Sequence, residues 1–311
     1  LLAVGDPSVV VPAAVTAVVN VGDDTRLHEL HISPDLDTIT YTLAGAVNPD
    51  TGWGLRGETW SAMDALDRYQ AVAPPGSSAG ATWFSLGDRD LATHLYRTRR
   101  LAEGAELSTV TAEIARAWAL PFTLLPATDD PLRTMVTVAD PDGDREVEFQ
   151  EYFVRRHHDV AVRAVRVAGA ADARPAPGVL EAVATADVVV VAPSNPIVSI
   201  GPVLAIDALR DAIASRRTRT VAISPIVGGA ALKGPADRMM RELGMAPSVV
   251  GVATAYRDLA ATLVIDEVDR DLVDAVEAEG VRAVVTETVM HDRDVAAALA
   301  RVVLDAGRPD R

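Results

Sequence analysis

The sequence has 311 residues, of which 49% are hydrophobic, so it can bury the core of one large domain or two smaller ones. Its 44 acidic and 29 basic residues give a formal net charge of -15, which disfavours nucleic-acid backbones and anionic membrane surfaces as partners. Cysteine is absent, which excludes disulfides, thiolate zinc sites and a cysteine nucleophile. No apolar run reaches the roughly 18 to 20 residues of a membrane span, so we expect a soluble, cytoplasmic protein.

The first predicted strand leads into a loop that is rich in carboxylates. Residues 13–19 are small, apolar and rich in β-branched side chains, which is typical of a parallel strand covered by helices on both faces. Ligands of open α/β sheets bind outside the carboxyl ends of the strands, so the next segment is the first candidate site. It carries four aspartates, Asp23, Asp24, Asp35 and Asp37. Residues 1–12 open in mid-element without a methionine, so we expect the natural start to be missing.

The sequence pattern in the middle of the chain differs from that of the rest. Asp37 is predicted to be the N-cap of a helix over residues 38–43. Beyond it, residues 45–159 are predicted to form an inserted α+β lobe, because helical patterns are followed there by a hairpin pattern. The expected elements are helices over residues 61–69, 91–100 and 108–117 and hairpin strands over residues 135–138 and 147–153, around a turn at 140–143.

The second half alternates regularly between strands and helices. This alternation predicts an α/β fold, with a Rossmann-like, doubly wound and mostly parallel sheet in an α/β/α sandwich. Residues 1–44 and 160–311 would form this nucleotide-binding core. The expected strands cover residues 160–167, 188–192, 220–223, 262–265 and 282–286, and the expected helices cover residues 178–185, 203–215, 237–243, 270–279 and 292–304.

Two loops of this half contain little but proline, glycine and small polar residues. Residues 192–202 follow one predicted strand, and residues 224–229 follow the next. Such loops expose backbone N–H groups and hydroxyls at helix N-termini, and these groups can donate hydrogen bonds to phosphate oxygens. Each loop alone is compatible with ordinary turn chemistry. Because they follow neighbouring strands, the two together favour a nucleotide or diphosphate site.

Five motifs in this order resemble a known family, the CofD/FbiA transferases of coenzyme F-420 biosynthesis. They are NVGDD at 20–24, SPDLDT at 33–38, LGDRD at 86–90 with ATH at 92–94, APSNP at 192–196 with SIGP at 199–202, and SPIVGG at 224–229. The resemblance covers nearly the whole chain. It implies a magnesium-dependent transfer of a 2-phospho-L-lactate or phosphoenolpyruvate unit from a guanosine diphosphate-activated donor to the hydroxyl of the deazaflavin FO, releasing GMP. Lys233 is the only lysine, and this actinobacterial kind of composition favours phosphoenolpyruvate.

The carboxylates suit this reaction, because Mg²⁺ with one or two carboxylate ligands neutralises charge on transferring phosphoryl groups. Asp35 and Asp37 are the candidate metal ligands and catalytic residues, and one of them can instead orient or accept the proton of the attacking hydroxyl. For Asp37 the alternative is the helix N-cap. For Asp23 and Asp24 the alternatives are a solvated turn or support of the metal ligands.

The remaining candidates would bind the two substrates. Arg89, between Asp88 and Asp90, can hold a phosphate or a ring carbonyl, or it can belong to a salt-bridge cluster at a helix start. The resemblance places this turn against FO, on which Trp53 and Trp83 can stack unless they pack in the core. His94 can donate to phosphate, although a helix histidine with satisfied hydrogen bonds is the commoner case. The nucleotide-binding candidates are Asn20, Pro193, Ser194, Asn195, Ser199, Ser224 and Gly228.

Other features leave alternatives open. Residues 155–158 (RRHH) are interpreted as a solvated strand end or a dimer contact, and we expect a homodimer. Members of the family begin with a glycine-rich loop of the GGxGG kind, which this sequence lacks at its start. A regulatory nucleotide-sugar-binding protein of the gluconeogenesis-factor kind would share the fold. An ordinary Rossmann dehydrogenase would need a G-x-G-x-x-G turn, and the sequence contains none.

Overall fold

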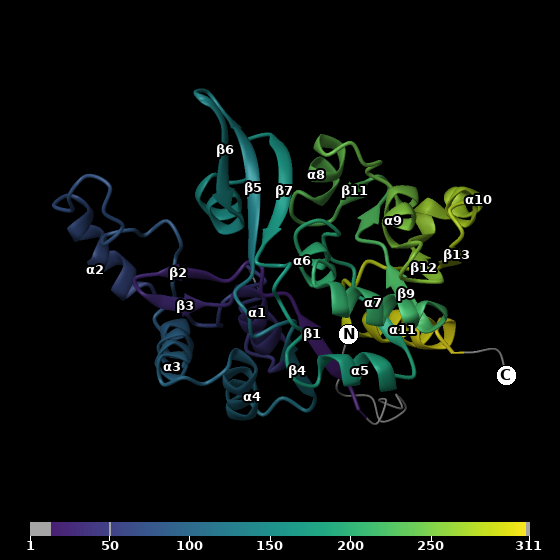
Figure 1. Ribbon diagram of the computed structural model, residues 1–311, viewed down its shortest axis with the longest axis horizontal. Helices are drawn as coiled ribbons and strands as arrows, with labels where there is room; N and C mark the ends of the chain where they lie inside the picture. Colours follow the sequence, from purple (N-terminus) through teal and green to yellow (C-terminus); the bar gives the residue numbers. More distant parts are fainter. Residues whose placement is uncertain (1–13, 50, 309–311) are drawn as a thin grey trace. The chain divides into compact units, whose positions relative to one another are not determined.

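The computed structural model describes residues 14–49 and 51–308, which form two compact units (Figure 1). Within the described residues, unit 1 comprises 161–165 and 178–308, and unit 2 comprises 14–160 and 166–177. Helices and parallel sheets alternate, which confirms the predicted α/β class. Residues 14–19 of the predicted strand and the predicted helix 38–43 lie in unit 2, whereas we assigned residues 1–44 to the core with the second half. Residues 1–13 lie outside the described part.

The reason for this grouping is a strand pair. β1 (Thr16–Val19) pairs in parallel with β4 (Thr123–Pro126), which belongs to the segment predicted as an insert. β2 (Thr25–Leu27) and β3 (Leu30–Ile32) follow β1 as a hairpin. Its two turn residues have φ angles of 51° and 61°, the left-handed geometry of a type I′ turn. The acid-rich loop is thus built around this hairpin.

Helix α1 (Pro34–Leu43) starts four residues earlier than predicted. Proline suits the first helical position, because its φ is already fixed and its missing N–H would have no partner there. Ser33 occupies the N-cap position, and the backbone N–H of Asp37 donates to the Ser33 carbonyl at 3.0 Å. The prediction that Asp37 is the N-cap is therefore wrong, because this residue already lies within the first turn.

The rest of unit 2 contains three further helices and an antiparallel hairpin. β6 begins and ends earlier than the predicted strand 147–153, and residues 151–155 form a π-helical turn instead. The three-stranded sheet has the order β6-β5-β7. The bounds are α2 (Ser61–Gln70), α3 (Asp90–Ala102), α4 (Leu107–Ala117), β5 (Arg133–Asp140), β6 (Gly143–Glu148) and β7 (Val162–Ala168), the last shared between the two units.

Unit 1 is built on a four-stranded parallel sheet of order β13-β12-β9-β8, which contains four of the five strands expected in the second half. The fifth, expected over residues 160–167, is β7, and the prediction that it joins this sheet is wrong, because it lies next to β5 in the three-stranded sheet instead. Because the four strands of unit 1 are parallel, their carboxyl ends meet at one edge. The strands are β8 (Val189–Val191), β9 (Thr220–Ile223), β12 (Thr262–Ile265) and β13 (Arg282–Val285), with a small hairpin of β10 (Ile226–Val227) and β11 (Ala230–Ala231). The helices are α5 (Val179–Thr185), α6 (Ile200–Leu204), α7 (Asp207–Ser215), α8 (Ala236–Glu242), α9 (Val249–Tyr256), α10 (Val273–Ala278) and α11 (Arg293–Ala306).

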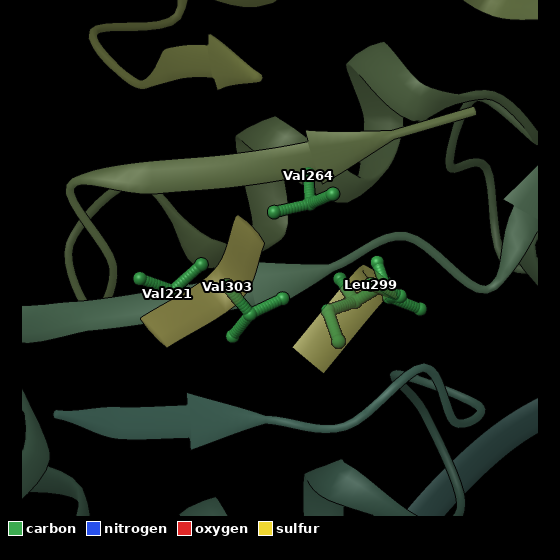
Figure 2. Packing of buried hydrophobic residues seen from close by; sticks show 5 residues of the cluster. Val221, Val264, Leu299 and Val303 are labelled. Carbon is green, nitrogen blue, oxygen red and sulfur yellow. The ribbon is translucent and has the colours of Figure 1, made fainter. Parts of the chain in front are cut away.

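One face of this sheet is covered by α11. Figure 2 shows Leu299 and Val303 of α11 against Val221 and Val264 of the two central strands. These side chains are fully or almost fully buried, so they supply hydrophobic stabilisation to unit 1. Among the described residues, no helix is both long and apolar enough to cross a membrane.

Replacing Leu299 by alanine should lower the free energy of unfolding of unit 1 by about 2–5 kcal/mol, because it leaves a cavity in a fully buried cluster. Leu232→Ala is the matched control, since Leu232 is 59% exposed and its loss should change stability by less than about 0.5 kcal/mol. Urea unfolding followed by circular dichroism measures both. Equal effects of the two substitutions would contradict the assignment of this core.

Candidate active site

The loop after β1 is tied to the first turn of α1 by one amide side chain. Asn20 directly follows β1, and its Oδ1 accepts a hydrogen bond from the backbone N–H of Gly22 at 2.7 Å. Its Nδ2 donates to Oδ2 of Asp35 at 2.9 Å. Asn20 therefore fixes the position of Asp35 relative to the strand end.

Three buried or part-buried carboxylates lie around this amide. Asp24 Oδ2 accepts a hydrogen bond from the Ser33 hydroxyl at 2.7 Å and lies 2.9 Å from Nε2 of His31. Asp23 is buried, and its Oδ1 has no hydrogen-bond partner among the described residues. The three acids Asp23, Asp24 and Asp35 are called the acid cluster below.

The acid cluster has more negative charge than its surroundings compensate. Burial raises the pKa of Asp35 to about 6, although the hydrogen bond from Asn20 opposes the shift. Burial and then the charge of Asp35 raise the pKa of Asp23 well above its ordinary value. Both shifts mean that the ionised forms are disfavoured unless a positive charge is bound nearby.

A second group of ionisable side chains lies between α1 and α3. Arg97 donates from Nη2 to Oδ1 of Asp37 and from Nη1 to Oδ2 at 3.1 Å, a two-pronged contact. His94 Nδ1 lies 3.6 Å from Asp37 Oδ2, and its Nε2 lies 3.1 Å from Asp90 Oδ2. The Tyr41 hydroxyl donates to Oδ1 of Asp90. We call these five residues the α1–α3 network.

Part of the α1–α3 network has the geometry of a metal site. Asp37, Asp90 and His94 each offer one ligand atom, and the three atoms lie within 4.8 Å of one another. Arg97, however, is 1% exposed and already provides the counter-charge of Asp37. Burial alone would lower the pKa of Arg97, but the Asp37 carboxylate more than offsets this, so the guanidinium stays charged.

The structure places the two predicted metal ligands in different groups. Asp35 and Asp37 both lie in the first turn of α1, and residues two apart on a helix do not face each other. Asp35 contacts Asn20, whereas Asp37 contacts Arg97. The predicted helix begins after Asp37, so the prediction missed this separation.

The turn at residues 88–90 lies at the start of α3 and also caps the start of α2. The Asp88 carboxylate accepts hydrogen bonds from the backbone N–H groups of Ser61 at 3.0 Å and Ala62 at 2.9 Å, so it caps α2. Arg89 donates from Nη1 to the carbonyl of Arg56 at 2.6 Å. In the described part of the chain, Arg89 forms no ion pair with Asp88 or Asp90, so the salt-bridge cluster that was the alternative role of Arg89 is not found there.

Glu58 is a residue of this turn that sequence reasoning missed. Its carboxylate accepts from the backbone N–H of Arg89 at 2.6 Å and of Asp90 at 3.2 Å, and so it satisfies the start of α3. The signal in the sequence is Gly87. A Cβ at this position would lie 2.1 Å from Cδ of Glu58, so only glycine leaves room for the carboxyl group.

The predicted stacking residues differ in their surroundings. Trp53 is 52% exposed. Trp83 packs edge-on against Phe84, with ring centroids 5.8 Å apart, and also lies against a buried cluster of Leu27, Ile32, Met63 and Leu86. Trp83 is thus half-buried against the core, in line with its alternative role, and its stacking on FO stays a prediction, as does that of the exposed Trp53.

In unit 1, the predicted nucleotide-binding residues lie in the loops after β8 and β9. Asn195 Oδ1 accepts from the backbone N–H of Ile197 at 2.9 Å, and the buried Ser224 hydroxyl donates to the carbonyl of Ile226 at 2.8 Å. The backbone N–H of Gly228 donates to Asp269 at 2.9 Å. The hydroxyls of Ser194 and Ser199, in the same loop as Pro193, make no hydrogen bond within the described residues.

Residues 7–306 match the family model described as 2-phospho-L-lactate transferase CofD, so the chain belongs to this family. A protein of Kitasatospora aureofaciens named phosphoenolpyruvate transferase is 42% identical over 291 residues, 93% of this chain and 88% of the relative. A protein of Mycobacterium sp. (strain JLS) with the same name is 44% identical over 280 residues, 88% of this chain and 82% of the relative. The family resemblance predicted from the motifs is confirmed, and the chain is a transferase of coenzyme F-420 biosynthesis.

The fold is also found among solved structures. A crystal structure of a Bacillus halodurans protein from the UPF0052 family superposes with a TM-score of 0.56 at 14% identity, covering 94% of this chain and 92% of the other. Another crystal structure of a Bacillus halodurans protein gives a TM-score of 0.54 at 16% identity, covering 94% of this chain and 91% of the other. At such low identity, these likenesses show a common fold.

Removing the cap of α2 should loosen this helix without unfolding the rest of unit 2. Asp88→Ala deletes the acceptor of two backbone N–H groups, so the amides at the start of α2 should exchange with deuterium severalfold faster. Hydrogen-exchange mass spectrometry measures this, with Asp142→Ala in the β5–β6 turn as the control. Unchanged exchange in residues 61–66 of the Asp88 variant would show that the cap is not needed.

Proposed function

We propose that this protein transfers a phosphoenolpyruvyl or 2-phospho-L-lactyl group from a guanosine diphosphate-activated donor to the hydroxyl of FO. The hydroxyl oxygen forms a bond to the phosphorus that carries the organic acid, and the bond from this phosphorus to the GMP oxygen breaks. GMP leaves with that oxygen, and the hydroxyl proton passes to a carboxylate. The names of the two relatives support phosphoenolpyruvate as the transferred unit.

The observation that carries this proposal is the uncompensated charge of the acid cluster. Mg²⁺ prefers oxygen ligands and commonly takes one or two carboxylates, with waters and substrate phosphates completing its coordination. The Asp35 carboxylate and the unpartnered Oδ1 of Asp23 are such donors. The cluster therefore fits Mg²⁺, and when bound the ion would neutralise charge on the transferring phosphoryl group.

The α1–α3 network fits Mg²⁺ less well. One of its three possible ligands is a histidine nitrogen, which suits zinc and related metals better. A second, Asp37, already has Arg97 as its counter-ion. We therefore assign the metal to Asp35 with Asp23, and Asp37 to the positioning of α1.

We assign the other predicted residues to substrate binding according to the chemistry of their side chains and loops. Arg89 would hold a phosphate oxygen or the ring carbonyl of FO through parallel donors, and Trp53 offers an exposed ring on which FO can stack. Asp88 and Asp90 hold this turn in place. The loops around Asn195 and Gly228 are proposed to bind the guanosine part of the donor. A homodimer and a cytoplasmic location stay predictions.

Asp35→Asn should reduce turnover about 100-fold or more, because it removes a charged metal ligand while keeping the side-chain shape. FO affinity should stay within about 2-fold, since metal ligation and ring stacking are separate interactions. A coupled assay with FO, Mg²⁺ and each guanosine-linked donor measures turnover, and quenching of FO fluorescence measures binding. Asp142→Asn, in the β5–β6 turn, is the control. Normal turnover of the Asp35 variant would refute the metal assignment.

Without metal, stability should fall as the pH rises. Burial raises the pKa of Asp35 from its ordinary 3.8 to about 6 in the folded protein, so the folded state holds this proton more tightly. The contribution of Asp35 to the free energy of unfolding is then largest below pH 4, and roughly 3 kcal/mol of this contribution is lost by pH 7.

Urea unfolding in EDTA at pH 5 and pH 7.5 tests this dependence. The Asp35→Asn variant should lose less stability between the two pH values, because it has no carboxylate to ionise at this position. Adding Mg²⁺ at pH 7.5 should restore stability to the unmodified protein only. A wild-type protein whose stability rises over this range, with no difference from the variant, would contradict the assignment.

A further inference from the structure

The first turn of α1 is held from two sides by contacts of different kinds. On one side, Asp35 accepts a hydrogen bond from Asn20 at the end of β1. On the other, Asp37 accepts two hydrogen bonds from Arg97 of α3. A rotation of α1 that brought Asp37 elsewhere would therefore also move Asp35.

Arg97 is anchored firmly enough to set this position. Its guanidinium is buried, and Nη1 lies 3.4 Å from both the carbonyl of His31 and Nδ1 of His94. The same stretch of α3 is joined to β3 a second time, because the backbone N–H of His31 donates to the Thr98 hydroxyl at 2.8 Å. Arg97 thus links α1 to β3 and α3 at once.

We propose that Arg97 is a positioning residue for the transferase: it is the built-in counter-ion of Asp37, and by fixing α1 it holds Asp35 in place for the divalent cation. The inference rests on the proposed Mg²⁺ site at Asp35. Metal binding depends on the placement of ligands within fractions of an ångström, so supporting contacts of this kind change affinity without touching the ion.

Replacing Arg97 distinguishes this role from its alternatives, because each alternative predicts a different change in cation affinity. If Asp37 were itself a metal ligand, losing its positive partner would free the carboxylate and tighten cation binding. If Arg97 only supported the fold, thermal stability would fall and cation affinity would not change. A positioning role predicts weaker cation binding in protein that is still folded.

The experiment compares Arg97→Met and Arg97→Lys with the unmodified protein. Binding of Mn²⁺ as a probe for Mg²⁺, followed by electron paramagnetic resonance, should weaken about 10-fold for the methionine variant. The lysine variant keeps the charge but lacks the two-pronged donor geometry, so we expect a smaller loss of about 3-fold. The half-saturating Mg²⁺ concentration in the FO assay should rise in parallel.

The control is Arg100→Met on the same helix. Arg100 pairs with Glu103 and Glu113 and contacts neither aspartate of α1, so its variant should bind Mn²⁺ normally. Circular dichroism and thermal unfolding identify folded variants, and if Arg97→Met does not fold, Arg97→Lys decides. Unchanged or tighter Mn²⁺ binding by the folded Arg97 variants would overturn the positioning role. Normal Mn²⁺ binding by Asp35→Asn would instead overturn the proposed metal site.

Discussion

The buried ion pair between Asp37 and Arg97 determines which carboxylates of this protein are available for chemistry. A buried charge must be paired, and here the pairing is internal, because a guanidinium from α3 binds both oxygens of one aspartate. Asp37 is thereby removed from the set of free acids near the end of β1. Asp23 and Asp35 have no comparable basic partner within the described residues, and they are the acids to which we assign the proposed cation.

The two groups of acids therefore differ in their surroundings, although one member of each, Asp35 and Asp37, lies in the first turn of α1. In the acid cluster, Asp23 and Asp35 have raised pKa values and lie beside a strand end, and their oxygen atoms suit a hard cation and a phosphate substrate. In the α1–α3 network, by contrast, Asp37 is paired with Arg97, and Asp90 accepts a hydrogen bond from Tyr41. The chain belongs to the CofD family, and we propose that the acid cluster serves its reaction. In the first turn of α1, Asp35 contacts Asn20 and Asp37 contacts Arg97.

Sequence patterns predicted what depends on neighbours along the chain. The strands of unit 1 and the α/β class followed from alternating apolar runs, and the family followed from five short motifs. The patterns failed where a distant residue decides. Arg97 lies 60 residues from Asp37 and Glu58 lies 31 residues from Arg89, so neither partner is visible locally. The start of α1 was misplaced because Asp37 was given the capping role, whereas Pro34 lets the helix begin earlier.

Gly87 illustrates how a residue without functional groups can still control a site. The carboxyl group of Glu58 occupies the space where any other side chain would begin, and from there it reaches the first amides of α3. Even alanine would push that carboxylate aside and leave two donors without an acceptor, in a turn that also holds Arg89. Substitution of Gly87 is therefore limited by the available volume. A variant that lost activity here would do so because its side chain displaces Glu58, since Gly87 has no functional group to lose.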